Sequence, residues 1–245
     1  MNFNEIKNIV GESGSIVFFG GAGTSTESGI PDFRSADGLY NEGTDKRYTP
    51  EEMLSRDFFL ERTEMFYHFY KSKMLYPDAR PNPAHEALVK LEQRGQLKAI
   101  ITQNIDGLHQ LAGSMNVLEL HGSVHRNRCM GCHAVYPLSS IVGSRGPVPL
   151  CERCGELIKP DVVLYQESLD MSLLERAATY IQQADVLIVA GTSLTVQPAA
   201  GLIRLYEGNQ FLLINKSATP MDGLANYIIS ESIAKVLSAL TADMI

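Results

Sequence analysis

The sequence has no tryptophan, only four cysteines and no long uninterrupted apolar run. A membrane-spanning helix needs about 20 predominantly apolar residues, and no segment approaches that length. The first fifteen residues also lack the basic start and continuous apolar stretch of a signal peptide. We therefore expect a cytoplasmic protein with no membrane partner.

An excess of positive charge is also missing. The chain has 21 Lys and Arg against 28 Asp and Glu, a formal net charge of −7. A chain of that charge offers no general nucleic-acid surface, so we expect no nucleic-acid partner. With 245 residues, 44% of them hydrophobic, it is long enough for one large globular domain that carries a smaller module. We expect a monomer.

The four cysteines fall in two close pairs. Cys129-x-x-Cys132 is followed, after eighteen residues, by Cys151-x-x-Cys154. This spacing fits a tetrahedral four-thiolate zinc site, which is structural because no position is left for water. A redox site is the alternative, but a thioredoxin-type site uses one such pair. A small basic surplus in residues 123–160 leaves a nucleic-acid-binding ribbon as another use of this module.

A glycine-rich stretch from Gly20 to Arg34, GGAGTSTESGIPDFR, follows an apolar run. Gly21 and Gly23 lack Cβ atoms, so the backbone there can take positive φ and approach a ligand closely. A helix N-terminus after the turn would favour an anion. Thr26 stands where a third glycine completes the dinucleotide fingerprint, so an ordinary strand-to-helix turn is the alternative. Residues 29–34 are expected to form a mobile lid that the bound cofactor orders.

Helical and strand patterns alternate along the chain. The expected helices span 2–11, 57–75, 84–93, 169–182, 198–206 and 232–240, and the expected strands span 15–19, 97–102, 117–120, 161–165, 185–190, 211–214 and 227–229. This alternation predicts an α/β fold with a Rossmann-like, doubly wound parallel sheet. Polar residues follow the strands at 97–102 and 117–120. They therefore lie at the carboxyl ends of these strands, which is where such folds bind ligands.

Six aromatic residues crowd the helical segment 57–75. We interpret them as the core of a subdomain, with a substrate channel as the alternative role for one or two rings. They are Phe58, Phe59, Phe66, Tyr67, Phe69 and Tyr70.

One histidine stands apart from the others. His68, His85 and His109 lie in or beside helical patterns, and we interpret them as structural or solvated. His121 instead ends a strand and precedes Gly122, at the edge where the polar residues gather. Because an unperturbed imidazole is mostly neutral at pH 7, His121 is a candidate general base.

Taken together, these motifs resemble the sirtuins, which are NAD-dependent protein lysine deacylases, and the chain is identified as a bacterial member. The matching residues are Gly21-Ala22-Gly23 with Ser25, Ser28 to Arg34, Thr102 to Asp106, His121-Gly122, the four cysteines and Gly191-Thr192-Ser193. The resemblance runs in order from about residue 4 to residue 240. It implies a Rossmann-like NAD-binding domain of residues 1–34, 76–122 and 161–245, and a small domain of residues 35–75 and 123–160. The small domain combines a helical module with the inserted zinc ribbon.

The resemblance also implies an NAD site. The pyrophosphate and adjoining ribose would meet Ala22, Thr26, Arg34 and Ser193; the nicotinamide would meet Phe33, Asn104, Ile105 and Asp106; the nicotinamide ribose would meet Gln103 and His121; the adenosine would meet Asn215 and Ile233; and Gly21, Gly23, Ser25, Gly191, Thr192 and Lys216 complete the set. The catalytic residues would be His121 and Asn104. An acyl-lysine protein or peptide would add a strand beside Val162, Val163, Tyr165 and Val196.

The implied reaction starts when nicotinamide leaves and the amide oxygen of acyl-lysine traps the ribose carbon. His121 then removes a ribose proton so that the acyl group passes to ADP-ribose. The zinc takes no part in this chemistry. An ADP-ribosyltransferase using the same NAD site, and a non-enzymatic NAD-binding or nucleic-acid-binding regulator, are the alternative functions.

Two departures from the family pattern bear on specificity and packing. Gly20 stands where many sirtuins have threonine, so a hydroxyl near the turn is absent. Relatives that remove succinyl groups carry a tyrosine and, three residues later, an arginine, whereas this chain has Tyr67 and Tyr70. Without the guanidinium a buried acyl carboxylate goes unpaired, so acetyl or longer apolar groups are favoured. Lys71 or Lys73 is the alternative partner for such a carboxylate.

Overall fold

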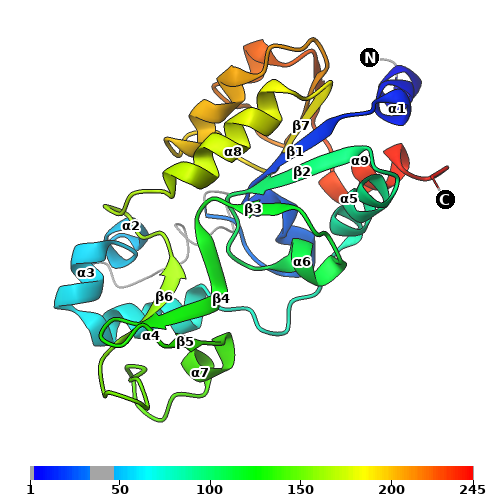
Figure 1. Cartoon of the computed structure of the whole chain (residues 1–245). Helices are drawn as coiled ribbons and strands as arrows, with labels where there is room; N and C mark the ends of the chain where they lie inside the picture. The colour runs from blue at the N-terminus through cyan, green and yellow to red at the C-terminus, as the bar shows by residue number, and fades with distance from the viewer. Residues whose placement is uncertain (1–2, 34–46, 245) are drawn as a thin grey trace.

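The computed structural model describes residues 3–33 and 47–244. A larger region holds a six-stranded sheet flanked by helices, and a smaller region lies beyond the carboxyl ends of the strands of that sheet (Figure 1). Both ends of the chain lie on the larger region (Figure 1). Within the described residues, no helix combines the length and the apolar character needed to cross a membrane.

The large sheet is entirely parallel, in the order β3-β2-β1-β7-β8-β9. Its strands are β1 Ile16–Gly20, β2 Leu97–Thr102, β3 Val117–Glu119, β7 Val186–Ala190, β8 Phe211–Ile214 and β9 Tyr227–Ile229. The chain winds outward from β1 through β2 to β3, then returns to the other side of β1 at β7. This doubly wound order confirms the predicted fold class and puts a switch point, where such sheets bind ligands, between β1 and β7.

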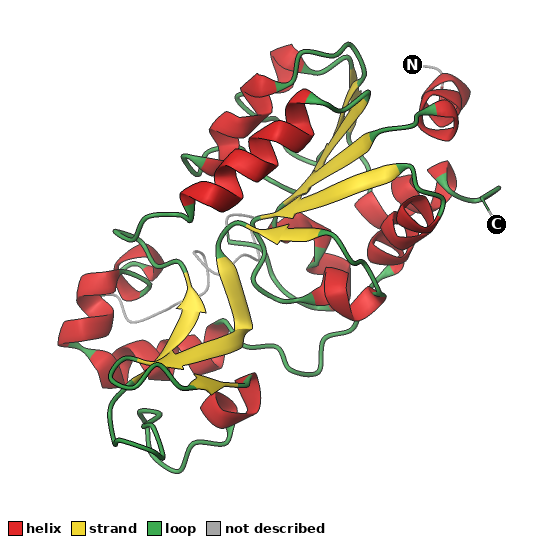
Figure 2. Ribbon diagram, viewed as in Figure 1, coloured by secondary structure: helices red, strands yellow, loops and turns green. Residues whose placement is uncertain are grey.

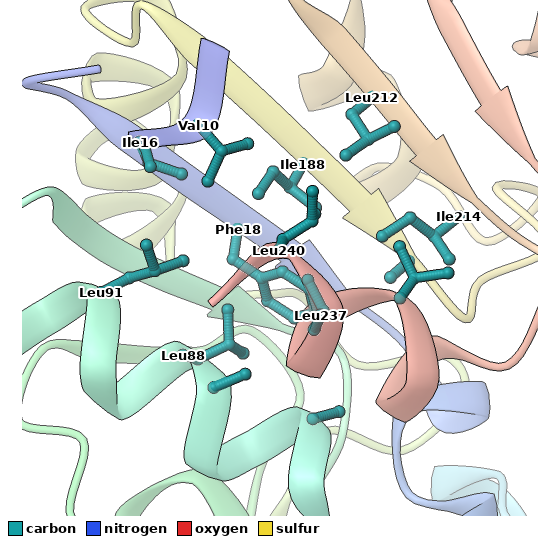
Figure 3. Packing of buried hydrophobic residues seen from close by; sticks show 14 of the residues in the cluster. Val10, Ile16, Phe18, Leu88, Leu91, Ile188, Leu212, Ile214, Leu237 and Leu240 are labelled. Carbon is teal, nitrogen blue, oxygen red and sulfur yellow. The ribbon is translucent and has the colours of Figure 1, made fainter. Parts of the chain in front are cut away.

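Both faces of this sheet are buried, which explains the continuous apolar run in β1. Ile16 and Phe18 pack against helices α1 (Phe3–Glu12), α5 (Pro83–Gln93) and α9 (Ile233–Leu240), as Figure 3 shows. Val17 and Phe19 point to the opposite face, toward helices α8 (Met171–Gln182) and η3 (Ala199–Leu205). Successive side chains of a strand alternate between faces, so each face receives every second residue. Helices on both sides of the sheet are visible in Figure 2.

The smaller region combines short helices with a three-stranded antiparallel sheet of order β5-β4-β6. Its elements are α2 Pro50–Met53, α3 Arg56–Glu61, α4 Thr63–Lys73, β4 Gly122–Cys129, β5 Val135–Tyr136, α7 Leu138–Val142 and β6 Ile158–Val162. All six aromatic residues of the 57–75 segment are buried in one cluster with Cys129, Ile158 and Val162. Their interpretation as a subdomain core is confirmed, and this core is shared by two segments far apart in sequence.

Two expected elements of this region differ from the structure. The single helical pattern at 57–75 is broken at Arg62, whose backbone leaves the helical region at φ −134°, ψ 46°, so α3 and α4 are separate. The strand expected at 161–165 spans Ile158–Val162 and pairs antiparallel with β4, outside the parallel sheet. Pro160 marked a boundary in the sequence, yet proline is tolerated here because β6 is an edge strand.

In the larger region, the expected helix at 198–206 is a seven-residue 3₁₀ helix, η3. Other short elements of the chain are η1 Ala22–Thr24, η2 Thr26–Ser28, α6 Leu108–Ala112 and η4 Asp222–Leu224.

Candidate active site

A cleft of about 1010 Å³ is lined by residues from both regions. Ligand pockets usually occupy about 300–1,000 Å³, so this cleft suits a large ligand. The sequence-predicted cofactor and peptide residues that line it are Gly21, Ala22, Gly23, Ser25, Thr26, Phe33, Gln103, Asn104, Ile105, Asp106, His121, Val162, Val163, Tyr165, Gly191, Thr192, Ser193, Val196, Asn215, Lys216 and Ile233. Arg34 lies outside the described residues.

The glycine turn after β1 packs against the turn after β7. Gly23 N–H donates to the Gly191 carbonyl at 2.8 Å, and a Cβ on Gly23 would lie 2.6 Å from Gly191 Cα. A Cβ on Gly21 would likewise lie 2.8 Å from the Gly191 oxygen. Gly21 has φ −131°, and Gly23 is not among the residues with positive φ, so neither uses the left-handed backbone that glycine allows. Their missing Cβ atoms serve turn-to-turn contact.

The helix expected after this turn is also different. The chain forms two short 3₁₀ turns, η1 and η2, which end at Gly29 with φ 83°. An anion at this place therefore meets a compact 3₁₀ turn in place of an α-helix N-terminus. The lid expected at 29–34 stays a prediction, because it includes Arg34.

Asn82 holds this turn and was missed from the sequence. Its Nδ2 donates to the Thr24 carbonyl and to Ser28 Oγ, each at 2.9 Å, while its Oδ1 accepts from Ala84 N–H to cap α5. Asn82 is buried, with 5% of its surface exposed. The signal was an asparagine before Pro83, which is typical of a helix N-cap followed by proline.

Three polar residues that line the cleft, Asn104, Ser25 and Asp106, are linked by consecutive hydrogen bonds. Asn104 Nδ2 donates to Ser25 Oγ at 3.1 Å, and Ser25 Oγ donates to Asp106 Oδ2 at 2.7 Å. The other carboxylate oxygen, Oδ1, accepts from Leu108 N–H at 2.9 Å. Asn104 N–H is itself fixed by Thr102 Oγ1 at 3.0 Å. Because an ionised carboxylate only accepts, the Ser25 proton points toward Asp106.

His121 lies where the chain passes from the parallel sheet to the antiparallel one. Its Nδ1 is 3.0 Å from the Gln103 carbonyl oxygen. A carbonyl can only accept, so Nδ1 carries the proton and Nε2 keeps the lone pair of a general base. Burial lowers the pKa of His121 below the usual value, and the Gln103 carbonyl opposes that shift. The imidazole is therefore neutral at pH 7.

Gly122 makes this crossing possible. It has φ 78°, and a Cβ at this position would lie 2.0 Å from the Asp161 carbonyl oxygen on β6. Gln103, whose carbonyl contacts His121, is also anchored, because its Nε2 donates to Thr192 Oγ1 at 2.9 Å. The ends of β2, β3 and β7 thus meet around His121.

Two other histidines form a buried pair beneath the cleft. The rings of His85 and His109 lie 4.7 Å apart between centroids, and both are at most 1% exposed. Burial, with a smaller contribution from His85, lowers the pKa of His109 to about 3. Burial also lowers the pKa of His85, against opposing effects of Asp106 and the Asn82 hydrogen bond. Both side chains are structural, as predicted.

The remaining histidines lie on the surface. His68 is exposed on α4, which confirms its interpretation as solvated. His133 is exposed beside Cys132 and is not part of the cysteine cluster. His125 Nε2 lies 2.9 Å from the Asp106 carbonyl oxygen, so it faces the loop of the polar chain.

The four cysteines converge, as their spacing predicts. All four Sγ atoms lie within 4.8 Å of one another, with Cys129 and Cys154 3.4 Å apart and Cys132 and Cys151 3.5 Å apart. Zinc–sulfur bonds of about 2.3 Å require sulfur atoms about 3.8 Å apart in a tetrahedron, so the residues fit zinc.

Hydrogen bonds support two of these sulfur atoms. Cys132 N–H donates to Cys129 Sγ at 3.4 Å. Tyr136 Oη lies 3.1 Å from Cys151 Sγ and accepts from Glu152 N–H at 3.2 Å, so its own proton is directed at the sulfur. Donors of this kind orient metal ligands. Tyr136 was not identified from the sequence, because its role depends on the fold of the ribbon.

The predicted peptide wall has most of its backbone already paired. Val163 N–H donates to the His121 carbonyl at 2.9 Å, and Tyr165 N–H donates to the Leu54 carbonyl at 3.0 Å. Leu164 N–H donates to Glu167 Oε2 at 2.9 Å. A peptide strand that used this Leu164 amide would therefore displace the Glu167 carboxylate.

These features define the class of protein. The doubly wound sheet has a cleft at its switch point, which is typical of a dinucleotide-binding α/β protein, and the neutral His121 in that cleft is a candidate general base. The model of the Sir2 family matches residues 21–198, so the chain belongs to the Sir2 family. The chain is 58% identical over 237 residues to an NAD-dependent protein deacetylase of Clostridium acetobutylicum, covering 97% of each chain. It is 43% identical over 238 residues to one of Staphylococcus aureus, again covering 97% of each.

Solved structures agree with the family assignment. A Sir2 variant in a complex with a deacetylated peptide and acetyl ADP ribose matches with a TM-score of 0.91 at 36% identity, covering 99% of this chain and 98% of the other. Sir2 bound to an acetylated peptide matches with a TM-score of 0.87 at 35% identity, with the same coverage.

Proposed function

We propose that this chain is an NAD-dependent protein lysine deacetylase, which transfers the acetyl group from lysine to ADP-ribose and releases nicotinamide. The observation that carries this proposal is the tautomer of His121. Its Nδ1 is tied to the Gln103 carbonyl, so a basic Nε2 is left in a cleft at the sheet's switch point. The named activities of the relatives support the same function. A non-enzymatic NAD-binding module has no need of such a base.

NAD bound in the cleft supplies a cationic nicotinamide leaving group and ribose hydroxyls that receive the acyl group. Asp106, held by Ser25 and Leu108 N–H, and the backbone of Ile105 orient the nicotinamide carboxamide. Phe33, which lines the cleft, would cover the nicotinamide ring. His121 Nε2 would accept a proton from a ribose hydroxyl. A general base of this kind typically contributes about 10²–10⁴ in rate.

The remaining predicted contacts are part of the same proposal. Ala22, Thr26, Arg34 and Ser193 would hold the pyrophosphate side. Asn215 and Lys216, which follow β8, and Ile233, which begins α9, would hold the adenosine side. Gly191 and Thr192 position the β7 turn, as the contacts to Gly23 and Gln103 suggest. Residues 1–34, 76–122 and 161–245 act as the NAD-binding domain, and residues 35–75 and 123–160 act as the small domain.

Four thiolates would hold the zinc ion, which would take no part in the acyl transfer. The ion would join the two cysteine pairs, and through them the core of the smaller region, because Cys129 and Cys151 are buried in that core. No ligand position remains for water, so the ion stabilises the fold.

Acyl-lysine proteins or peptides are the proposed partners, and acetyl is favoured over succinyl. The Tyr67 hydroxyl donates a hydrogen bond to the Ile158 carbonyl, and Lys71 Nζ donates one to Ser144 Oγ at 2.7 Å. Neither Tyr67 nor Lys71 lines the cleft. Neither therefore pairs with an acyl carboxylate, whose unpaired burial is costly. Lys73 lines the cleft and is the remaining alternative.

No nucleic-acid partner, a monomeric state and a cytoplasmic location complete the proposal. Two of the basic residues in the zinc module are already paired. Arg126 contacts Glu119 at 2.6 Å and Asp161 at 2.9 Å, and Lys159 contacts Glu167 at 3.0 Å. Their charge is neutralised locally, which weakens the case for a nucleic-acid-binding ribbon.

Mass spectrometry after incubation with NAD and an acetyl-lysine peptide separates the three candidate functions. A deacetylase yields nicotinamide, free lysine peptide and acetyl-ADP-ribose together. An ADP-ribosyltransferase instead adds the mass of ADP-ribose to a protein, and a binding module consumes no NAD.

A further inference from the structure

The chain crosses from the larger region to the smaller one directly after His121. β3 ends at Glu119, and β4 begins at Gly122 and leads into the smaller region beside β6 (Figure 1). Two contacts hold β6 and the residue that follows it against this crossing. Val163 N–H donates to the His121 carbonyl at 2.9 Å, and Gly122 lies directly against the Asp161 carbonyl oxygen. The position of His121 therefore depends on how β3, β4 and β6 are held together.

One guanidinium group joins these three strands. Arg126, on β4, donates through Nη1 to Glu119 Oε2 at 2.6 Å and through Nε to Asp161 Oδ2 at 2.9 Å. Glu119 belongs to the parallel sheet, and Asp161 belongs to the antiparallel sheet. Arginine suits this place because its planar group presents several donors in fixed directions, whereas a lysine offers one point charge. The bridge thus spans the crossing at which His121 lies.

The burial of Glu119 distinguishes this bridge from an ordinary surface ion pair. Only 8% of the Glu119 side chain is exposed, against 41% for Asp161. Within the part of the chain that the structure describes, the Glu119 carboxylate has no partner besides Arg126. Exposed ion pairs contribute little on their own, but a buried charge that loses its partner is costly. Arg126 is therefore held at Glu119, and from there it reaches Asp161.

We propose that Arg126 is a positioning residue, which holds His121 in place at the cleft by tying β3 to β6. This inference rests on the proposed function, in which His121 is the general base. Arg126 does not line the cleft, so it acts through the strands and not by touching substrate or NAD. A displacement of about 1 Å at a reacting group can lower a rate by about 10²-fold. Loss of the bridge should therefore lower kcat and leave NAD binding in place.

The first test measures deacetylation of an acetyl-lysine peptide by the wild type and Arg126→Ala. We expect kcat to fall by about 10- to 100-fold, with NAD affinity by calorimetry near the wild-type value. Arg128→Ala is the matched control, because Arg128 is exposed on the same strand and has no ion pair among the described residues. It should keep the wild-type kcat. An unchanged kcat in Arg126→Ala, or an equal loss in the control, overturns the proposal.

The second test asks whether Arg126 acts through His121. Arg126→Ala is introduced into His121→Ala, in which no base is left to position. The added change should then lower kcat by no more than about 2-fold. The full loss in both backgrounds would mean that Arg126 acts independently of His121, which overturns the proposal. Failure of the proposed function is recognised separately, because His121→Ala alone would then keep the wild-type turnover.

A third variant separates positioning from stability. Arg126→Ala alone leaves the Glu119 charge buried and unpaired, which destabilises the fold. The same measurements are therefore made on Arg126→Ala with Glu119→Gln, which removes the bridge without leaving that charge. This double variant should melt at a higher temperature than Arg126→Ala and show the same low kcat. Recovery of the wild-type kcat would show that Arg126 only neutralises Glu119, and would overturn the proposal.

Discussion

Ser25 Oγ donates a 2.7 Å hydrogen bond to Asp106 Oδ2, and this bond joins the turn after β1 to the loop after β2. Asn104 donates to the same hydroxyl, so one serine connects both polar residues proposed to bind nicotinamide. Ser25 is 1% exposed, and hydrogen bonds to charged groups are stronger than neutral ones. The turn after β1 and the proposed nicotinamide pocket are therefore coupled through the hydrogen bonds of Ser25.

Replacing Ser25 with alanine should weaken this coupling. A lost hydrogen bond to a charged group is worth about 1.5–3 kcal/mol, so kcat/KM for NAD should fall by about 10- to 100-fold. Ser114→Ala is the matched control, because Ser114 is a buried serine outside the cleft whose hydroxyl has no partner among the described residues. Steady-state kinetics with varied NAD make the comparison. Equal NAD kinetics in both variants would contradict the role given to Ser25.

Replacing His121 with alanine should remove the general base and leave the NAD site in place. We expect kcat to fall by about 10²–10⁴, with NAD affinity by calorimetry near the wild-type value. In the wild type, burial lowers the pKa of His121. The acidic limb of kcat/KM should therefore have its midpoint below 6.5, the ordinary histidine value. Unchanged turnover in the variant, or a midpoint above that value, would refute the assignment.

The buried His109 should make the protein sensitive to acid. Its pKa is about 3 in the folded protein, whereas the unfolded chain binds the proton near the ordinary value of 6.5. The unfolded state binds more protons below pH 6.5, so stability falls as pH drops from there toward 3. By this linkage His109 removes about 2 kcal/mol between pH 7 and pH 5.

Urea unfolding of His109→Leu at those two pH values tests this prediction. The variant should show a smaller loss of unfolding free energy on acidification than the wild type, since one titrating group is gone. His68→Leu is the control, because His68 is exposed and should leave the pH dependence unchanged. A pH dependence identical in all three proteins would be incompatible with a neutral, buried His109.

The hydrogen bond from Tyr136 to Cys151 should slow zinc release. Removing a hydrogen-bond donor to a metal ligand changes metal affinity by about 10- to 100-fold, so Tyr136→Phe should release zinc faster to a chromophoric chelator. Tyr180→Phe, outside the ribbon, serves as the control. Chelation of the wild type should also lower the melting temperature, since the metal holds the buried Cys129 and Cys151 in the core. Identical release rates would exclude a role for Tyr136.

The sequence predicted the parallel sheet and the clustering of the four cysteines well, because in each case one local pattern decided the structure. Continuous apolar runs identified β1 and β7, and the cysteine spacing identified the cluster that the structure forms. The sequence-based prediction failed where contacts between segments far apart in the sequence decide the local structure. Gly21 and Gly23 were interpreted as glycines that let the backbone approach a ligand, but the turn that contains Gly191 fills the space beside them.

Other features depend on contacts that no local pattern reports. Asn82 was recognisable as a helix cap, yet its bonds to Thr24 and Ser28 depend on how α5 packs. Pro160 looked like a boundary, because an edge position in a small antiparallel sheet cannot be inferred from one strand alone.

The most direct test of the central assignment follows the acetyl group itself. An acetyl-lysine peptide carrying a trideuterated acetyl group is incubated with NAD, and the products are analysed by mass spectrometry. We predict that the label appears in acetyl-ADP-ribose, with equal amounts of nicotinamide and free lysine peptide. Label recovered only as free acetate while NAD stays intact would contradict an NAD-dependent deacetylase.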